Sequence, residues 1–230
     1  MEIIKVKNYK EMSRVASEIV VGEMLKKGDI VIGFATGATP LGLYRNLVKA
    51  YKKGEVDFSK VKSFNLDEYY PMKGGDKNSY RRYMFRNLFG RVNIKRGNVN
   101  LLDGEARDFG KECLDYEKAI KKSPIDLQIL GVGANGHIGF NEPGSLKSSR
   151  TRLVDLSDDT VKRNSGIFWK VPTRALTMGV RTILSSKKII LLASGKAKAR
   201  AIGRLMKGKV GADCPVSFLR KHKNLLVISC

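Results

Sequence analysis

The chain has 230 residues, which fits one large domain or two small ones. Its 42% apolar and 29% charged residues allow a sizeable core and exclude wholesale disorder. No apolar run reaches the roughly 18 residues of a membrane-spanning helix. The first residues, MEIIKVKNYKEMSR, lack the apolar stretch of a secretory signal and carry acids that a transit peptide avoids. We therefore expect a soluble, cytoplasmic protein that does not enter a membrane.

The net charge is unusually high. The 44 Lys and Arg residues outnumber the 22 Asp and Glu residues, which gives +22 at pH 7. The excess is uneven, because sixteen basic residues and one acid, Asp213, lie between Thr160 and the end of the chain. Such a field attracts nucleic acid, anionic lipid or a small phosphorylated ligand. A solvated, lysine-rich surface explains the same charge without a function.

The three cysteines, Cys113, Cys214 and Cys230, are scattered and form no CxxC or Cys–His pattern. They predict neither a disulfide framework nor a zinc site, and we expect no bound metal.

Short β-rich runs alternate with amphipathic stretches along the chain. Strands are predicted at residues 3–6, 29–35, 61–65, 127–132, 188–193 and 224–228, and helices at about 10–26, 40–53, 78–90, 104–122 and 196–207. This alternation predicts a Rossmann-like α/β fold, with an open, mainly parallel sheet and helices on both faces. No repeat or linker divides the chain, so a single domain spanning 1–230 is expected. Ligands of such folds bind outside the carboxyl ends of the strands.

The first strand-to-helix junction follows DIVIGFA and contains Gly37, Ala38, Thr39 and Pro40. Thr39 is predicted as the N-cap and Pro40 as the first helical residue. A loop of small residues that opens a helix directs backbone N–H groups toward a phosphate. Tight turns between strands and helices use the same residues, so the motif alone leaves both interpretations open.

The second junction, FNLDEYY, places Asp67 and Glu68 at the end of a predicted strand. A carboxylate at that edge of the sheet faces the ligand cleft and can act as a general base. The alternative is an N-cap or loop acid.

The third junction, GVGANGHIGFNEP, has four glycines within nine residues and presents His137 between Asn135 and Glu142. A histidine with an acceptor that fixes its tautomer and a carboxylate that stabilises its charged form suits acid–base catalysis. A lone histidine is often structural, but such a dense set of glycines costs stability and favours a functional loop.

The fourth junction, LLASGKAKA, places Lys198 on the apolar face of the next helix, together with Ile202 and Leu205. A lysine in the first turn opposes the helix dipole and is stabilised by an anion nearby. The alternative is a lysine whose ammonium group reaches out to water.

Taken in order, these motifs resemble a known family. ATGATPLGLY, FNLDEYY, GANGHIGFNEPGS with SSRTR soon after, RALTMGVRTIL and LLASGKAKA are similar to segments of the glucosamine-6-phosphate deaminases, from about Phe34 to Leu219. The related sugar-phosphate lactonases share the fold and a similar phosphate loop. They lack the GHIGFNEP segment and are the weaker match.

The resemblance implies an enzyme of amino-sugar catabolism that converts glucosamine 6-phosphate and water to fructose 6-phosphate and ammonia without a cofactor. It implies that Asp67 moves a proton between C2 and C1 and that His137, paired with Glu142, opens the sugar ring. The implied phosphate-binding residues are Gly37, Ala38, Thr39 and Lys198.

The chain departs from the family pattern at two catalytic positions. Asn135 stands where many members have Asp; an amide can accept from the imidazole N–H but cannot stabilise imidazolium by charge. Gly166 replaces an Arg that reaches the substrate phosphate from a mobile lid, here expected around residues 145–172. Arg163 or Lys162 could take its place with poorer geometry, so a raised KM is expected.

The regulated members of the family are hexamers with an effector site. Here Arg152 remains of a pair of basic effector contacts, and Val154 replaces the other. The resemblance therefore implies the short, unregulated form, a monomer or weak dimer without an effector site. No nucleic-acid-binding motif accompanies the positive charge, and aromatic residues make up only 8% of the chain, so specific nucleic-acid binding is not expected.

Overall fold

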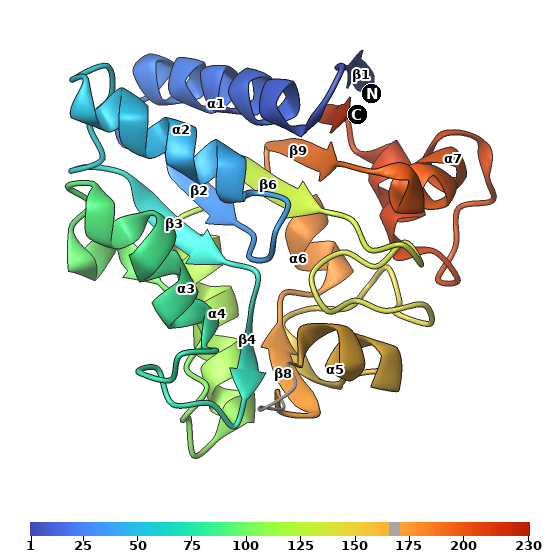
Figure 1. Ribbon diagram of the computed structural model, residues 1–230. Coiled ribbons are helices and arrows are strands. Elements are labelled where there is room, and N and C mark those ends of the chain that lie inside the picture. Colours follow the sequence, from blue (N-terminus) through green and yellow to red (C-terminus); the bar gives the residue numbers. More distant parts are fainter. Residues whose placement is uncertain (166–170) are drawn as a thin grey trace.

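The computed structural model describes residues 1–165 and 171–230, and a seven-stranded sheet forms its centre (Figure 1). The strands follow one another across the sheet in the order β1 (Glu2–Lys5), β10 (Leu225–Ser229), β9 (Lys188–Ala193), β6 (Leu127–Gly131), β2 (Val31–Phe34), β3 (Lys62–Asn65) and β5 (Val99–Asn100). All neighbouring pairs are parallel. The predicted parallel α/β fold is confirmed, and all six strands predicted from the sequence form; the two-residue β5 was not predicted.

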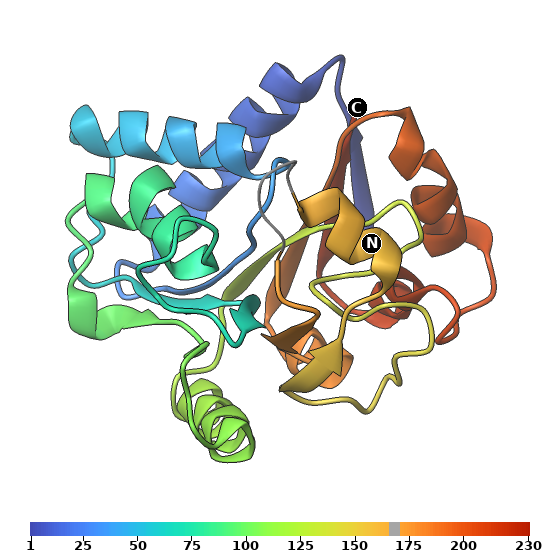
Figure 2. The same cartoon turned by 60° about the horizontal axis from the view of Figure 1, so that its bottom comes forward.

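Helices cover both faces of this sheet, as predicted (Figure 2). One face carries α1 (Tyr9–Lys26), α2 (Leu41–Lys52) and α3 (Tyr80–Asn87), and the other carries α4 (Phe109–Lys122), α6 (Val180–Leu184) and α7 (Ala199–Lys207). Because side chains alternate along a strand, each strand serves both cores. In β9, Ile190 and Leu192 pack toward α1 and α2, whereas Ile189 and Leu191 pack toward α4 and α7.

A second, three-stranded antiparallel sheet was not predicted from the sequence. It has the order β4 (Asp67–Tyr70), β8 (Arg174–Thr177) and β7 (Arg152–Asp155), and α5 (Asp158–Asn164) follows β7. The sequences of its strands, DEYY, RLVD and RALT, carry no continuous apolar run that would mark them as strands. The single domain over residues 1–230 and the mobile lid around 145–172 stay predictions.

Several element boundaries differ from the prediction. The 78–90 helix is split into α3 and a 3₁₀ turn at Phe89–Arg91, and α4 begins at Phe109 behind its N-cap Asp108. Residues 196–207 form a 3₁₀ turn (Lys196–Lys198) followed by α7. The predicted N-cap at Thr39 is wrong: Pro40 precedes the helix without a side-chain cap, and Thr39 lines a cavity instead.

No helix in the described ranges, 1–165 and 171–230, is long and apolar enough to cross a membrane.

Candidate active site

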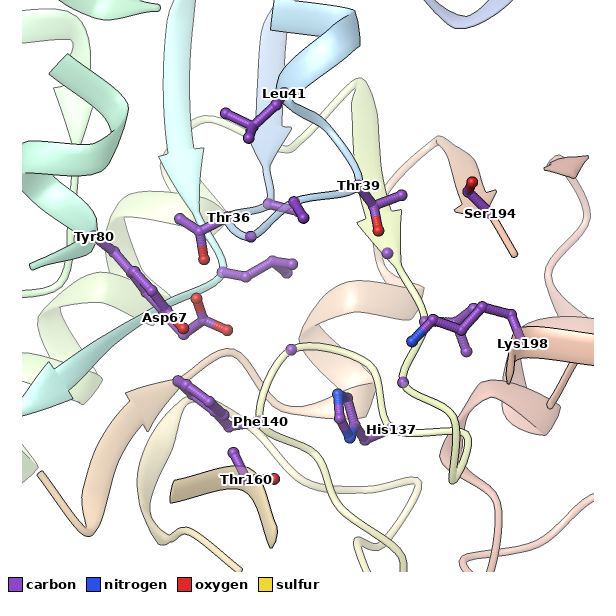
Figure 3. A pocket seen from close by; sticks show the side chains of 18 of the residues that line it. Thr36, Thr39, Leu41, Asp67, Tyr80, His137, Phe140, Thr160, Ser194 and Lys198 are labelled. Atoms are coloured by element: carbon purple, nitrogen blue, oxygen red, sulfur yellow. The ribbon is translucent and has the colours of Figure 1, made fainter. Parts of the chain in front are cut away.

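A cavity of about 670 Å³ opens at the carboxyl ends of four adjacent strands, β9, β6, β2 and β3 (Figure 3). Six of the predicted site residues line it: Gly37, Ala38, Thr39, Asp67, His137 and Lys198. The other two, Asn135 and Glu142, contact His137 from outside the cavity lining. The structure therefore brings all eight predicted residues to one place from four separate segments of the chain.

The loop between β2 and α2 is held by two tyrosine hydroxyl groups. Tyr83 on α3 donates to the carbonyl of Gly37 at 2.6 Å, and Tyr9 on α1 donates to the carbonyl of Ala38 at 3.0 Å. Tyr9 also accepts a bond from the N–H of Gly42 at 2.8 Å. Gly37 has a φ of 94°, a conformation that favours glycine. The loop is thus fixed at the N-terminal end of α2, where an anion is stabilised by the helix dipole.

Asp67 is a buried carboxylate that faces the cavity. Its side chain belongs to a residue only 5% exposed, and among the described residues its Oδ1 has no hydrogen-bond partner. Burial and the neighbouring charge of Glu68 raise the pKa of Asp67 to about 8, although a bond from the Thr36 side chain opposes the rise. Gly139 lies beside Asp67 with a φ of 56°, a conformation that favours glycine, and a Cβ there would lie 3.2 Å from Oγ1 of Thr177.

Glu68 has a structural role. Its carboxylate accepts the backbone N–H groups of Tyr80 at 2.9 Å and Arg81 at 2.8 Å, which begin α3, and that of Tyr69. Burial raises the pKa of Glu68 to about 7 despite these bonds. Adjacent residues of a strand point to opposite sides, so the pair divides into a cavity carboxylate and a helix-capping carboxylate. The sequence alone left both interpretations open for the pair.

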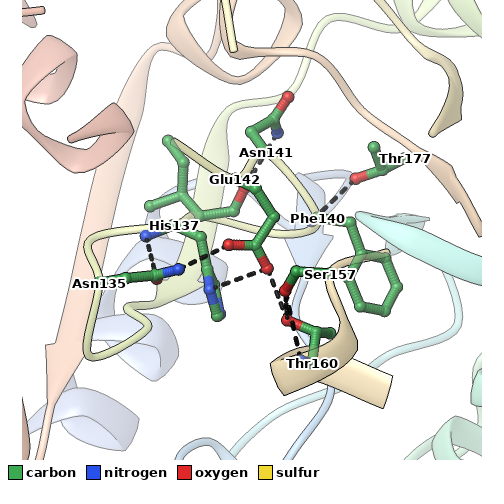
Figure 4. A network of polar contacts seen from close by, with 9 residues as sticks. Asn135, His137, Phe140, Asn141, Glu142, Ser157, Thr160 and Thr177 are labelled. Atoms are coloured by element: carbon green, nitrogen blue, oxygen red, sulfur yellow. Dashed lines mark hydrogen bonds and ion pairs between the residues drawn. The ribbon is translucent and has the colours of Figure 1, made fainter. Parts of the chain in front are cut away.

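His137 and Glu142 form a pair beside the cavity (Figure 4). Nδ1 of His137 lies 3.3 Å from Oε1 of Glu142. Gly133 makes room for the imidazole, since a Cβ at that position would lie 2.3 Å from Cε1 of the ring. Burial alone would raise the pKa of Glu142, but bonds from His137, Thr160 and Asn135 lower it to about 2. Glu142 is therefore a carboxylate at neutral pH and can stabilise a protonated imidazole.

The hydrogen bonds of the Asn135 side chain differ from those expected from the sequence. Its Nδ2 donates to Oε2 of Glu142 at 2.6 Å, and its Oδ1 accepts from the backbone N–H of His137 at 3.2 Å. The amide therefore does not accept from the imidazole N–H. Asn135 instead helps to orient Glu142, whose Oε1 lies 3.3 Å from Nδ1 of His137.

Lys198 lies in the 3₁₀ turn before α7, half-buried, with its ammonium group directed toward the cavity (Figure 3). Its predicted inward orientation is confirmed. Arg204 on α7 is half-buried and forms an ion pair with Asp213.

Sequence reasoning missed other polar residues of the cavity: Thr36, Arg45, Tyr80, Thr160 and Ser194. Thr36 belongs to the ATGATP motif and Ser194 to the LLASGK motif, and their positions at strand ends could have identified them. Arg45 lies four residues after Leu41, which also lines the cavity, so helical spacing could have found it. No sequence signal connected Thr160 on α5 to the catalytic loop.

Arg152 donates to Oδ1 of Asn141 at 2.9 Å and so supports the residue next to Glu142. Val154 packs against the buried cluster around Tyr69 and Phe140. Gly166 and the side chain of Arg163 lie outside the described part of the chain, and Lys162 is exposed. Within residues 1–165 and 171–230, no three metal-binding side chains cluster.

Fold and site together define a class: α/β enzymes that hold a small anionic ligand at the carboxyl edge of a parallel sheet, beside a buried carboxylate and a His–Glu pair. A family model described as glucosamine-6-phosphate isomerases/6-phosphogluconolactonase matches residues 9–228. The chain belongs to this family.

Relatives called glucosamine-6-phosphate deaminase occur in Clostridium novyi (strain NT) and Clostridium botulinum (strain Kyoto / Type A2). Each is 48% identical over 232 residues, covering 99% of this chain and 96% or 95% of the relative. A solved structure of a monomeric glucosamine-6-phosphate deaminase has a TM-score of 0.96 at 40% identity, covering 100% of this chain and 97% of that one. A 6-phosphogluconolactonase from Thermotoga maritima, with a TM-score of 0.79 at 24% identity over 100% of this chain and 99% of that one, shares the fold.

Proposed function

We propose that the protein converts glucosamine 6-phosphate and water to fructose 6-phosphate and ammonia. The names of its 48% identical relatives support this reaction. The observation that carries the proposal is the single cavity lined by Asp67, His137 and Lys198, which combines a base, a ring-opening group and a cation for phosphate.

The chemistry divides between the two sides of the cavity. His137, supported by Glu142 and Asn135, transfers a proton to or from the ring oxygen as the pyranose opens. Asp67 then removes the proton from C2 and returns it to C1, while a proton passes from the amino group to O1; this leaves an imine at C2 and a hydroxyl at C1. Water adds to that imine and the C2–N bond breaks, releasing ammonia and leaving the ketone of fructose 6-phosphate. The raised pKa of Asp67 suits this step, because a base with higher proton affinity removes a carbon-bound proton more readily.

The phosphate group of the substrate binds in the same cavity. We assign it to the loop Gly37, Ala38 and Thr39 and to Lys198, with Arg45 adding positive charge from α2. Backbone N–H groups at a helix N-terminus and an ammonium group form charge-assisted bonds with phosphate oxygens. Among these groups, the positive charge of Lys198 favours a sugar phosphate over a neutral sugar.

One assay tests the reaction against its alternatives. Purified protein is given glucosamine 6-phosphate, with ammonia and fructose 6-phosphate measured, and in parallel 6-phosphogluconolactone, with ring hydrolysis measured. Equal amounts of ammonia and fructose 6-phosphate support the deaminase, and hydrolysis of the lactone alone supports a lactonase. Salt-sensitive binding to duplex DNA together with no ammonia release supports the nucleic-acid interpretation of the +22 charge.

We infer a monomer or weak dimer in solution, in keeping with the solved relative described as monomeric. The large exposed apolar side chains in the described ranges come from four parts of the chain: Met1, Leu25, Phe109 with Leu114 on α4, and Leu146. Sedimentation equilibrium measures the state directly, and a stable hexamer would contradict the inference. The cytoplasmic location stays a prediction.

A further inference from the structure

Glu142 is contacted by three side chains that come from different parts of the chain (Figure 4). Asn135 and His137 belong to its own loop, whereas Thr160 belongs to α5. The hydroxyl of Thr160 donates to Oε1 of Glu142 at 2.6 Å, the same oxygen that faces Nδ1 of His137 at 3.3 Å. One oxygen of the Glu142 carboxylate therefore contacts both the imidazole of His137 and the Thr160 hydroxyl on α5.

The direction of the Thr160 bond is fixed by its surroundings. Thr160 is 4% exposed, and its Oγ1 accepts a bond from the hydroxyl of Ser157 at 3.0 Å. Ser157 is the N-cap of α5 and accepts the backbone N–H of Thr160 at 3.3 Å. Because the ionised carboxylate of Glu142 can only accept, the Thr160 hydroxyl gives its one hydrogen to Glu142, and Ser157 donates to Thr160.

We propose that Thr160 is a positioning residue through which the placement of α5 sets the protonation of His137 during ring opening. The proposal rests on the role of His137 in the proposed function. A donor to Oε1 withdraws charge from the oxygen that stabilises the protonated imidazole. With Thr160 in place, His137 gives up its proton more readily; without it, the protonated ring is favoured.

Other ionisable groups surround this pair. Asp67 and Lys198 line the same cavity, and α5 carries Asp158 and Asp159 in its exposed first turn. Arg152 supports the neighbouring Asn141, and Cys214 lies beneath the loop, since a Cβ on Gly136 would lie 2.4 Å from its Sγ. None of these groups is changed by a substitution at Thr160, so they form a constant background for the test.

Thr160→Val keeps the shape of the side chain and removes the hydroxyl. We expect the limb of kcat/KM that reports ring opening to move to higher pH by about half a unit to one unit. Thr160→Ser, which keeps the donor, should restore the original profile. A residue that only stabilised the fold would lower kcat/KM equally at all pH values. Should Thr160→Val not fold, Thr160→Ala removes the same hydroxyl without adding a methyl group.

Thr151→Val is the matched control. Thr151 is buried, and its hydroxyl donates to Oε1 of Glu117 at 2.6 Å, outside the cavity lining. This variant loses a bond of the same kind and length as the one between Thr160 and Glu142. It should lower Tm yet leave the pH limb in place.

An NMR titration tests the proposal without any substrate. The chain has two histidines, His137 and His222, so the imidazole signals are assigned with a single His222→Gln variant. The His137 signal should titrate at higher pH in Thr160→Val than in the wild type. Superimposable titrations in the two proteins overturn the proposal. If the wild type releases no ammonia but the titration moves, the proposed function fails and the coupling between Thr160 and His137 stands.

Discussion

At the scale of single residues, the cavity holds the carboxylate that we propose as the base in an environment that opposes its charge. Asp67 is buried, one of its oxygens has no partner among the described residues, and its pKa is raised to about 8. In the unfolded chain the same group has a pKa of 3.8. The folded state therefore binds this proton more tightly than the unfolded state, and ionised Asp67 reduces stability.

Asp67→Asn should abolish isomerisation and increase stability at neutral and alkaline pH. The gain should be absent below about pH 4, where both states of the wild type hold the proton. It should grow toward pH 8 by at most roughly 1.4 kcal/mol per pH unit. Denaturant unfolding at several pH values measures it, and near-normal turnover in the variant would remove Asp67 from the mechanism. A gain that does not vary with pH would contradict the burial argument.

Asn135→Asp tests the departure from the family pattern at residue 135. The amide donates to Oε2 of Glu142 at 2.6 Å, so the substitution replaces a donor with a second carboxylate at that distance. The added negative charge should favour the protonated form of His137 and move the ring-opening limb of kcat/KM upward by about one pH unit. Superimposable profiles, with circular dichroism confirming the fold, would exclude Asn135 from ring opening.

Lys198→Ala should weaken substrate binding through the phosphate. Loss of a charge-assisted bond costs about 1.5–3 kcal/mol, or about a 10- to 100-fold rise in KM. Lys207→Ala is the control, because Lys207 lies exposed on α7 and does not line the cavity. An unchanged KM in Lys198→Ala would support the alternative in which the lysine reaches water.

At the scale of elements, the sequence predicted the strands and helices that carry a regular pattern of apolar residues. It did not predict the elements that depend on tertiary contacts. The parallel strands carry apolar runs because their side chains pack into both cores, so the sequence predicted their positions. The four-residue strands of the second sheet carry no such run, and β4 begins at Asp67, which is not a strand former. The contact between Thr160 and Glu142 joins residues 18 apart in the chain, through an unpredicted helix. The sequence indicated the candidate site residues because their motifs follow the strands whose carboxyl ends form the cavity.

Tyr83→Phe tests whether α3 holds the phosphate loop. The variant loses the bond to the Gly37 carbonyl but keeps the ring, so the loop should become less ordered. A neutral hydrogen bond contributes about 0.5–1.5 kcal/mol, which predicts a rise in KM of about two- to tenfold with little change in kcat. Tyr70→Phe is the matched control, because its hydroxyl donates to the carbonyl of Ala106, away from the cavity. Equal KM values in both variants would contradict the assignment.

At the scale of the whole molecule, we expect the +22 charge to attract the negatively charged substrate of the proposed reaction. The chain from Thr160 onward carries most of this excess, and it contributes Ser194 and Lys198 to the cavity wall. A positive field of this kind raises the local concentration of an anionic substrate in addition to any direct contact. The field is reduced by salt, whereas contacts inside the cavity are screened much less.

Raising KCl from 10 to 150 mM should therefore increase KM for glucosamine 6-phosphate severalfold and leave kcat nearly unchanged. Over this range the screening length falls from about 30 Å to about 8 Å, so charges far from the cavity no longer attract the substrate. Chloride is the suitable anion, because sulfate or phosphate would compete for the loop at the N-terminus of α2. Lys198→Ala should keep part of the salt dependence, since many surface charges share the effect. A KM that does not change with KCl would show that the positive charge does not act on the substrate.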